Sequence, residues 1–121
     1  MNLNTKRPLS VTIVAILYLA VGIAGFIGHG WEALRATHFP PDAIAIEITE
    51  LLAIIAGAFL LRGQNWARWL AAAWMAFHVA ISVFHPFREL AIHVVFLVLI
   101  TWILFRSEAT RYFRKAEANA T

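Results

Sequence analysis

Four ionisable side chains stand inside otherwise apolar stretches of this chain: Glu47, Glu50, His78 and His93. Carboxylates and neutral imidazoles together suit zinc, iron or manganese, so the four are candidate metal ligands. Two histidines can instead hold a b-type haem, for which His78 and His93 are the candidate pair. Such groups can also relay protons across a membrane. Di-iron bundles pair Glu and His at a spacing of three residues, whereas Glu89 and His93 here are four apart.

Composition assigns the chain to the membrane class. It has 121 residues, of which 61% are hydrophobic and only 14% charged, and its mean hydropathy is +0.72. A soluble domain of this size exposes much of its surface and needs more charge to stay dissolved. The absence of cysteine excludes disulfides, thiolate metal sites and thiol catalysis. No nucleophile–base pair or phosphate loop is recognisable, so the sequence does not indicate an enzyme.

The apolar runs predict spanning helices joined by short connections, which makes neighbouring helices antiparallel. The first run has about 20 residues, longer than the roughly 7–15 of a signal peptide, so we expect a retained helix. The predicted fold is an all-α integral membrane four-helix bundle with antiparallel up-down topology, a single domain over residues 1–121. The predicted helices cover about 8–29, 43–61, 65–85 and 87–112, and residues 116–121 are expected to fray.

Length arithmetic places both glutamates inside the second helix. If Glu47 and Glu50 marked the membrane surface, only residues 51–61 would remain to cross the bilayer. That segment is too short for a hydrocarbon core of about 30 Å at about 1.5 Å per residue. The helix is therefore predicted to begin near Ala43, after the candidate N-cap Asp42.

The remaining ionisable groups fall at the same level. Counted from the helix ends, the intramembrane groups lie about 7 to 12 Å below the outer surface: Glu47, Glu50, His78 and His93. Three further residues are predicted at the rim of the same site: His29, His85 and Glu89. Because intramembrane ionisable residues usually face inward, the set predicts one site in the outer half of the bundle.

Lysine and arginine predict the orientation. Eight of them fall on one side of the predicted membrane: Lys6, Arg7, Arg62, Arg68, Arg106, Arg111, Arg114 and Lys115. Arg35 and Arg88 fall on the other side, and this split predicts that both termini are cytoplasmic in a bacterial inner membrane. The basic charge therefore marks topology, and we expect no nucleic-acid partner. The segment 106–115 either extends the last helix or lies on anionic headgroups.

Small residues at regular spacing predict where the helices touch, because close backbone approach drives association inside lipid. Three such seams are present: Gly22, Gly25 and Gly28; Ala53 and Gly57; and Ala72, Ala76 and Ala80.

The opening KRPLSVTIVAILYLAVGIAG and the stretch LLRGQNWARWL, with the preceding Gly57, resemble a widespread type of small bacterial four-helix membrane protein. The layout is similar to that of DoxX-like proteins, some of which are implied to be subunits of quinone-linked oxidoreductases. The shared residues belong to hairpins and topology signals. The resemblance therefore implies an architecture and assigns no role to the glutamates or histidines.

Three functions remain open. The first is an accessory or structural subunit that binds other membrane proteins, or a second copy of itself, within the lipid bilayer. The second is a redox or binding module that holds a transition metal, haem or quinone near Glu50, His78 and His93. The third is a small proton-coupled transporter. A purely structural network, in which buried Glu–His hydrogen bonds pin the helices, competes with the last two.

Overall fold

Within residues 6–120, which it describes, the computed structural model of the chain is all-helical with five helices. Their bounds are α1 Leu9–Arg35, α2 Ala43–Leu61, α3 Asn65–Ser82, α4 Phe87–Phe105 and α5 Ser107–Ala120. The all-α prediction is thus confirmed. Three of these helices, α1, α2 and α4, are long and apolar enough to cross a membrane, which supports the membrane class. α3 is not among them, since Asn65, Arg68 and His78 lower its hydropathy.

Helix boundaries differ from the prediction in three places. α1 continues to Arg35 rather than ending near residue 29, because nothing in HGWEALR breaks a helix before Pro40. α3 ends at Ser82 rather than 85, and Pro86 then caps α4 at its N-terminal end.

The predicted fourth helix, 87–112, is in fact two helices. Arg106 adopts an extended conformation with φ −64° and ψ 159°, which ends α4 and redirects the chain into α5. α5 is amphipathic and buries Ala109, Tyr112 and Phe113 against the other helices. Residues 116–120, expected to fray, continue α5, and Thr121 lies outside the described residues.

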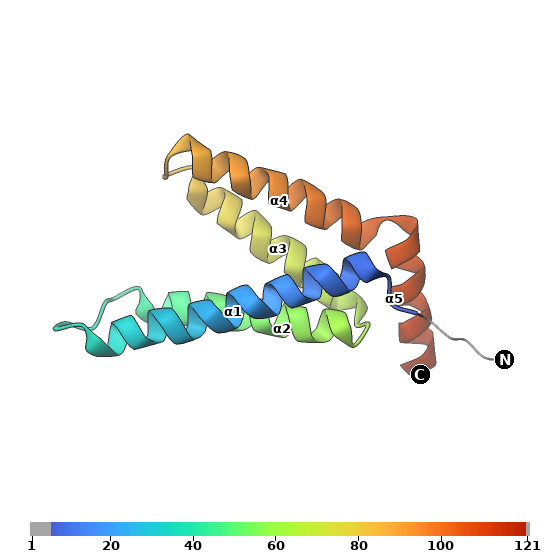
Figure 1. Cartoon of the computed structure of the whole chain (residues 1–121), viewed down its shortest axis with the longest axis horizontal. Helices are drawn as coiled ribbons and strands as arrows, with labels where there is room; N and C mark the ends of the chain where they lie inside the picture. The colour runs from blue at the N-terminus through green and yellow to red at the C-terminus, as the bar shows by residue number, and fades with distance from the viewer. Residues whose placement is uncertain (1–5, 121) are drawn as a thin grey trace.

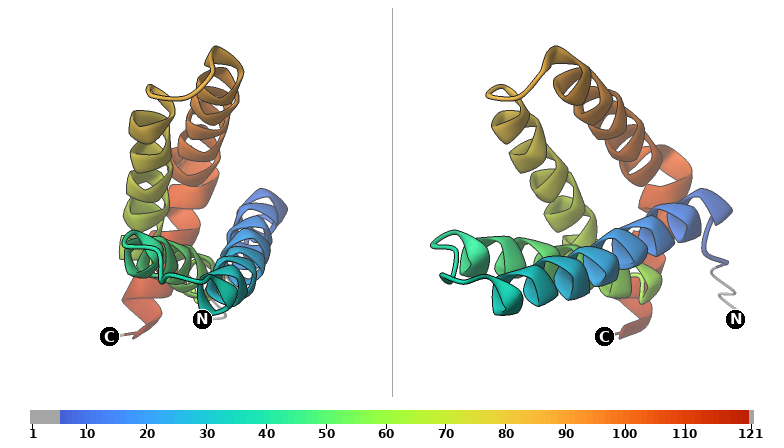
Figure 2. Two further views of the ribbon diagram at one scale, coloured as in Figure 1. Left: turned by 90° about the vertical axis from the view of Figure 1, so that its left-hand side faces the viewer. Right: turned by 60° about the vertical axis from the view of Figure 1, so that its left-hand side comes forward.

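The helices form two antiparallel hairpins, α1–α2 and α3–α4, which meet at one end and diverge toward the other (Figures 1 and 2). α5 lies at the end where they meet, beside the turn 62–64, and we call this the closed end. At the open end lie the loop 36–42 and the turn 83–86. The expected compact bundle is therefore replaced by two arms that share contacts mainly at the closed end.

Arg68 ties the closed end together. Its guanidinium donates to the Asn65 side chain at 2.7 Å, the Leu104 carbonyl at 3.3 Å and the Thr110 hydroxyl at 3.0 Å. It also lies over the Phe113 ring at 5.4 Å. With 6% of its surface exposed, Arg68 connects α3, α4 and α5 and is more than a topology signal.

Glycines bring α1 and α2 into close backbone contact along their length. A Cβ atom on Gly57 would lie 2.7 Å from the Ala15 carbonyl oxygen, and one on Gly22 would lie 2.9 Å from the Glu50 carbonyl oxygen. Gly28, predicted for the same seam, has open space in front of it. On α3 the buried alanines are Ala67 and Ala71.

The third predicted seam is wrong in register. Ala76 and Ala80 are exposed and Ala72 is half-buried. The reason is the divergence of the two hairpins, which leaves the last turns of α3 without a neighbour on that face. Burial on α3 is therefore concentrated near the closed end.

We predict that Gly22→Ala destabilises the protein, because the added methyl group meets backbone atoms of α2 that cannot rotate away. Overpacking of this kind costs about 1–3 kcal/mol. The matched control is Gly28→Ala, which meets no atom and gains helix propensity of up to about 1 kcal/mol. The free energy of unfolding in mixed micelles measures both. Equal effects of the two substitutions would contradict the close contact.

Candidate functional site

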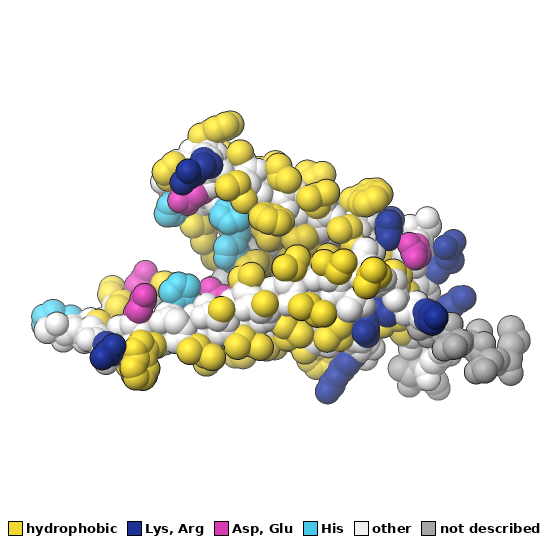
Figure 3. Space-filling view, in the orientation of Figure 1, with side chains coloured by type: hydrophobic (Ala, Val, Ile, Leu, Met, Phe, Trp, Pro, Cys, Tyr) yellow, Lys and Arg dark blue, Asp and Glu magenta, His cyan; other side chains and the backbone are white. Residues whose placement is uncertain are grey.

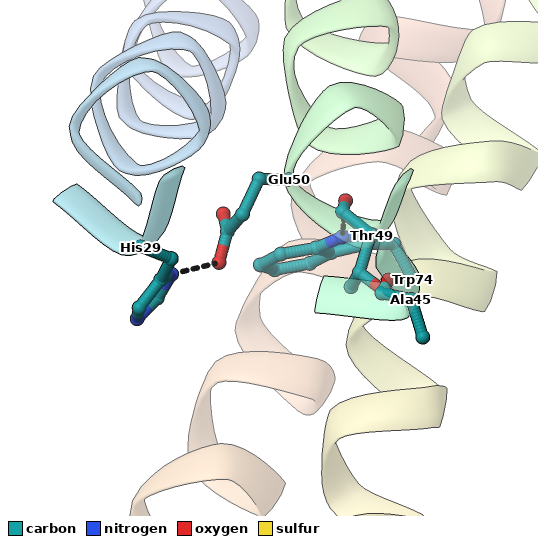
Figure 4. A network of polar contacts seen from close by, with 5 residues as sticks. All are labelled: His29, Ala45, Thr49, Glu50 and Trp74. Carbon is teal, nitrogen blue, oxygen red and sulfur yellow. Dashed lines mark hydrogen bonds and ion pairs between the residues drawn. The ribbon is translucent and has the colours of Figure 1, made fainter. Parts of the chain in front are cut away.

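Glu50 is buried between the two hairpins. It is 9% exposed, and its carboxyl group lies directly over Gly25, where a Cβ atom would be 2.5 Å from the carboxyl carbon. One carboxyl oxygen, Oε1, lies 3.6 Å from Nδ1 of His29, and Figure 4 shows Glu50 between His29 and Trp74. The other oxygen, Oε2, is buried and has no hydrogen-bond partner among residues 6–120. This oxygen is closed to solvent and lies against α1, where a Cβ atom on Gly25 would be 2.6 Å from it.

Glu47 faces a different space. Its carboxyl group lies against Gly30, and it lines an apolar groove of about 580 Å³ between α1 and α2 near the open end. Its Oε1 is also buried without a partner in the described chain. The prediction that Glu47 and Glu50 form one wall of a single site is therefore not met, although both lie in α2 three residues apart.

Trp74 and His78 link α2 to α3. The Trp74 indole Nε1–H donates to the Thr49 carbonyl at 2.8 Å, which crosses between the helices. His78 stacks on the Trp74 ring with centroids 3.9 Å apart, and its Nδ1 lies 2.9 Å from the Trp74 carbonyl. Since a carbonyl oxygen can only accept, Nδ1 of His78 carries the proton.

Ser82 fixes the second histidine. Its hydroxyl donates to the His78 carbonyl at 2.7 Å, and its oxygen also contacts Nδ1 of His93. A serine hydroxyl has one proton, so His93 must donate from Nδ1 to the Ser82 oxygen. Both histidines are thereby held with Nδ1 protonated. In this tautomer Nε2 is bare, and neither Nε2 has a hydrogen-bond partner in the described part of the chain.

A cavity of about 270 Å³ lies between the hairpins where they begin to diverge. All four long helices line it, and five of its residues carry polar groups: Tyr18, Glu50, Trp74, His78 and His93. Figure 3 shows the histidine and acidic side chains along the two arms, between the closed end and the open end. We call this space the inter-hairpin cavity.

Tyr18, Trp74 and Ser82 were missed as site residues. The Tyr18 hydroxyl donates to the Ala71 carbonyl at 2.6 Å and joins α1 to α3, and its ring lies 5.2 Å from that of Trp74. A polar tip on a side chain in an aliphatic helix is the signal that could have found Tyr18 and Trp74. Ser82 lacked any such signal, because its role depends on which ring comes to face it.

The three residues predicted at the rim of the site lie on different hairpins. His29 contacts Glu50 from α1, whereas His85 and Glu89 form a separate exposed pair at 3.6 Å beside the turn 83–86. Glu89 therefore pairs with His85 rather than with His93. Neither His85 nor Glu89 lines the inter-hairpin cavity.

The metal and haem hypotheses find different support in this geometry. Among residues 6–120, no three His, Asp or Glu side chains come close enough together to hold one metal ion. The rings of His78 and His93 are near each other, with centroids 6.0 Å apart. However, the cavity lies just below the roughly 300–1,000 Å³ of pockets for drug-sized ligands, so a haem would require the hairpins to move apart.

We predict that His78 and His93 both carry a proton on Nδ1 and leave Nε2 bare. Nitrogen-15 NMR of the histidine-labelled protein reports this directly. Ser82→Ala removes the acceptor of the His93 proton, so it should change the His93 tautomer and destabilise the fold by about 1–3 kcal/mol. His78 is the internal control and should keep its spectrum. An Nε2-protonated His93 in the unsubstituted protein would contradict the arrangement.

Comparisons of the chain with protein-family models, curated proteins and solved structures find no match. The resemblance to DoxX-like proteins stays a prediction. The evidence that bears on function is therefore the arrangement of Glu50, His78 and His93 around the inter-hairpin cavity.

Proposed function

We propose that the chain is a multi-pass protein of a bacterial inner membrane in which α1 to α4 cross the bilayer. Three of these helices have the length and hydropathy to do so. The surface supports the proposal, since most large hydrophobic side chains on α1 and α4 are exposed, among them Ile16, Val95 and Val98. Contiguous apolar surface of this extent belongs in lipid or against another protein.

α3 crosses with the others in this proposal. It lies between α2 and α4 in the chain, joined by the short connections 62–64 and 83–86, and runs antiparallel to both. Its 18 residues span about 27 Å, close to the thickness of the hydrocarbon core. Asn65 and Arg68 lie at its closed end and His78 lines the inter-hairpin cavity. Ser82 is buried and hydrogen-bonded to His78 and His93, so these polar residues need not contact lipid.

The distribution of basic residues supports a cytoplasmic closed end. Arg7 donates to the Leu61 carbonyl at 2.6 Å and Arg106 to the Ser10 hydroxyl at 2.8 Å, which gathers basic residues of both hairpins at this end. Arg35 and Arg88 lie at the open end. The positive-inside rule then puts both termini in the cytoplasm.

Single cysteines test this topology, and the chain has no cysteine of its own to interfere. We predict that Thr37→Cys and Val83→Cys react with a membrane-impermeant maleimide added outside intact spheroplasts. Ser107→Cys, at the closed end, should react only after lysis. Labelling of all three from one side would contradict the proposed crossing of α1 to α4.

Within that membrane domain, we propose that the protein is a small binding module whose ligand occupies the inter-hairpin cavity. The observation that carries this proposal is a set of polar groups on an otherwise apolar wall: the Glu50 side chain and the Nε2 atoms of His78 and His93, which have no hydrogen-bond partner in the described part of the chain. Binding sites typically combine an apolar lining with a few convergent polar groups. A purely structural network would use these atoms on each other, as it does Nδ1 of both rings.

Cavity size supports a ligand with one ring. A cavity of about 150 Å³ can hold benzene. The 270 Å³ here therefore fits one aromatic ring with a short substituent. A quinone head group and a small transported amine both fall within this size, so a redox module and a transporter both remain compatible with it.

Filling the cavity tests the binding proposal. We predict that ethylbenzene shifts the histidine nitrogen resonances of His78 and His93 in the full chain in detergent, and that Val21→Trp, on the cavity wall, abolishes the shift. Ile23→Trp is the matched control, since it adds the same side chain to α1 outside the cavity. Identical responses of the two variants would mean that the probe acts only by entering the micelle.

A second candidate function, the accessory subunit, is favoured by α4. Only Ile100 and Leu104 of this helix are buried, so it contributes little to the core of its own chain. A helix so poorly packed offers its surface to another membrane protein. A cavity that admits no probe, in a chain that migrates from native membranes within a larger complex, would favour this role over the binding module.

A further inference from the structure

Within residues 6–120, four hydrogen-bond donors of the inter-hairpin cavity are already engaged inside the protein. The Tyr18 hydroxyl, the Trp74 indole and Nδ1 of His78 each donate to a backbone carbonyl, and Nδ1 of His93 donates to Ser82. Each of these groups has a single proton to give. The donors on the cavity wall are thus all used inside the protein.

The unpaired polar groups that remain on the cavity wall are hydrogen-bond acceptors. The Glu50 side chain lines the cavity, and Nε2 of His78 and of His93 has no hydrogen-bond partner in the described part of the chain. The centroids of the two rings lie 6.0 Å apart, and both rings line the same cavity. Among residues 6–120, the cavity wall thus presents three hydrogen-bond acceptors and no free donor, so it favours ligands that carry hydrogen-bond donors.

We infer that the cavity binds an arylalkyl primary ammonium ion, with its ammonium group toward Glu50, His78 and His93 and its ring in the apolar part. This inference rests on the proposed binding function and names the ligand class for the same site.

The chemistry of the ammonium group matches the wall in number and in charge. A primary ammonium carries three N–H donors and no acceptor, which equals the three available acceptors. Its positive charge complements the carboxylate of Glu50, the one acidic side chain that lines the cavity. The Phe96 ring and the side chains of Leu17 and Met75 supply the apolar part of the lining.

Other ligands of similar size fit less well. A quinone presents carbonyl oxygens, which are acceptors and find no donor on this wall. A carboxylate or phosphate ligand likewise finds no hydrogen-bond donor on this wall, and Glu50 repels its negative charge. A quaternary ammonium has the charge without N–H donors, and an alcohol has a single donor without the charge. A primary ammonium, a quaternary ammonium and an alcohol on the same ring therefore separate the effect of charge from that of hydrogen bonding.

Isothermal titration calorimetry of the purified full chain in detergent tests the inference with three probes on the same ring. We expect 2-phenylethylammonium to bind at least tenfold more tightly than N,N,N-trimethyl-2-phenylethylammonium and at least tenfold more tightly than 2-phenylethanol. Hydroquinone serves as a fourth probe, with two neutral donors on one ring. Each titration is corrected with the Val21→Trp variant, in which the cavity is filled.

Two substitutions on one helix localise the effect. Glu50→Gln should reduce the affinity for 2-phenylethylammonium at least tenfold and leave 2-phenylethanol within twofold. Glu47→Gln removes the same charge one turn away in α2, outside the inter-hairpin cavity, and should leave both affinities unchanged. Circular dichroism of both variants checks that they fold.

The outcomes separate the inference from the proposed function. If ethylbenzene enters the cavity but 2-phenylethylammonium binds no better than its trimethyl analogue, the binding function stands and the ammonium inference is overturned. Tighter binding of hydroquinone than of the ammonium ion overturns it in favour of neutral donors. Equal losses in Glu47→Gln and Glu50→Gln overturn the assignment to this cavity. If no probe enters, the proposed function and the inference both fall.

Discussion

Close backbone contact between α1 and α2 is the constraint on which the rest of the structure depends. Gly22, Gly25 and Gly57 let the two helices approach until a single methyl group would clash. This contact makes the α1–α2 hairpin a continuous surface and holds the Glu50 carboxyl over Gly25, where a side chain at that position would clash with it. The position of Glu50 at the edge of the inter-hairpin cavity is therefore a consequence of glycine in the neighbouring helix. Without that approach, the acid would have room to turn away from the second hairpin.

The α3–α4 hairpin is attached to this surface in a different way. Tyr18 and Trp74 make the connecting hydrogen bonds midway along the helices, and Arg106 donates to Ser10 at the closed end. Toward the open end, α1 and α4 make few contacts, so the arms separate. Directional bonds at one end and little packing at the other leave a space between the hairpins, and the ionisable residues lie along it. The same asymmetry explains why the helix with the fewest buried residues is α4.

The sequence was sufficient to predict the helical class, and α2 begins and ends at the predicted residues 43 and 61. These bounds could be predicted from the length of the apolar segment, from Asp42 before it and from Gly63 in the turn after it. The division between α4 and α5 could not be predicted, because no glycine or proline marks Arg106. The site was predicted in part: Glu50, His78 and His93 line one cavity, but Glu47 does not. Residues three apart on a helix point about 60° away from each other, which at a helix–helix contact is enough to face two different spaces. Such a difference depends on the position of α1, which the sequence of α2 does not contain.

Nδ1 of His93 donates to the Ser82 hydroxyl, which in turn donates to the backbone carbonyl of His78. These two bonds share the Ser82 hydroxyl and form a continuous chain from a ring on α4 to a carbonyl on α3. In such a chain each bond strengthens its neighbours. A group that donates to the bare nitrogen of His93 makes the opposite N–H of that ring more acidic, and hence a stronger donor to Ser82. Occupation of the cavity would then stiffen the contact between α3 and α4, so that the rigidity of this hairpin would report whether the cavity beside it is filled.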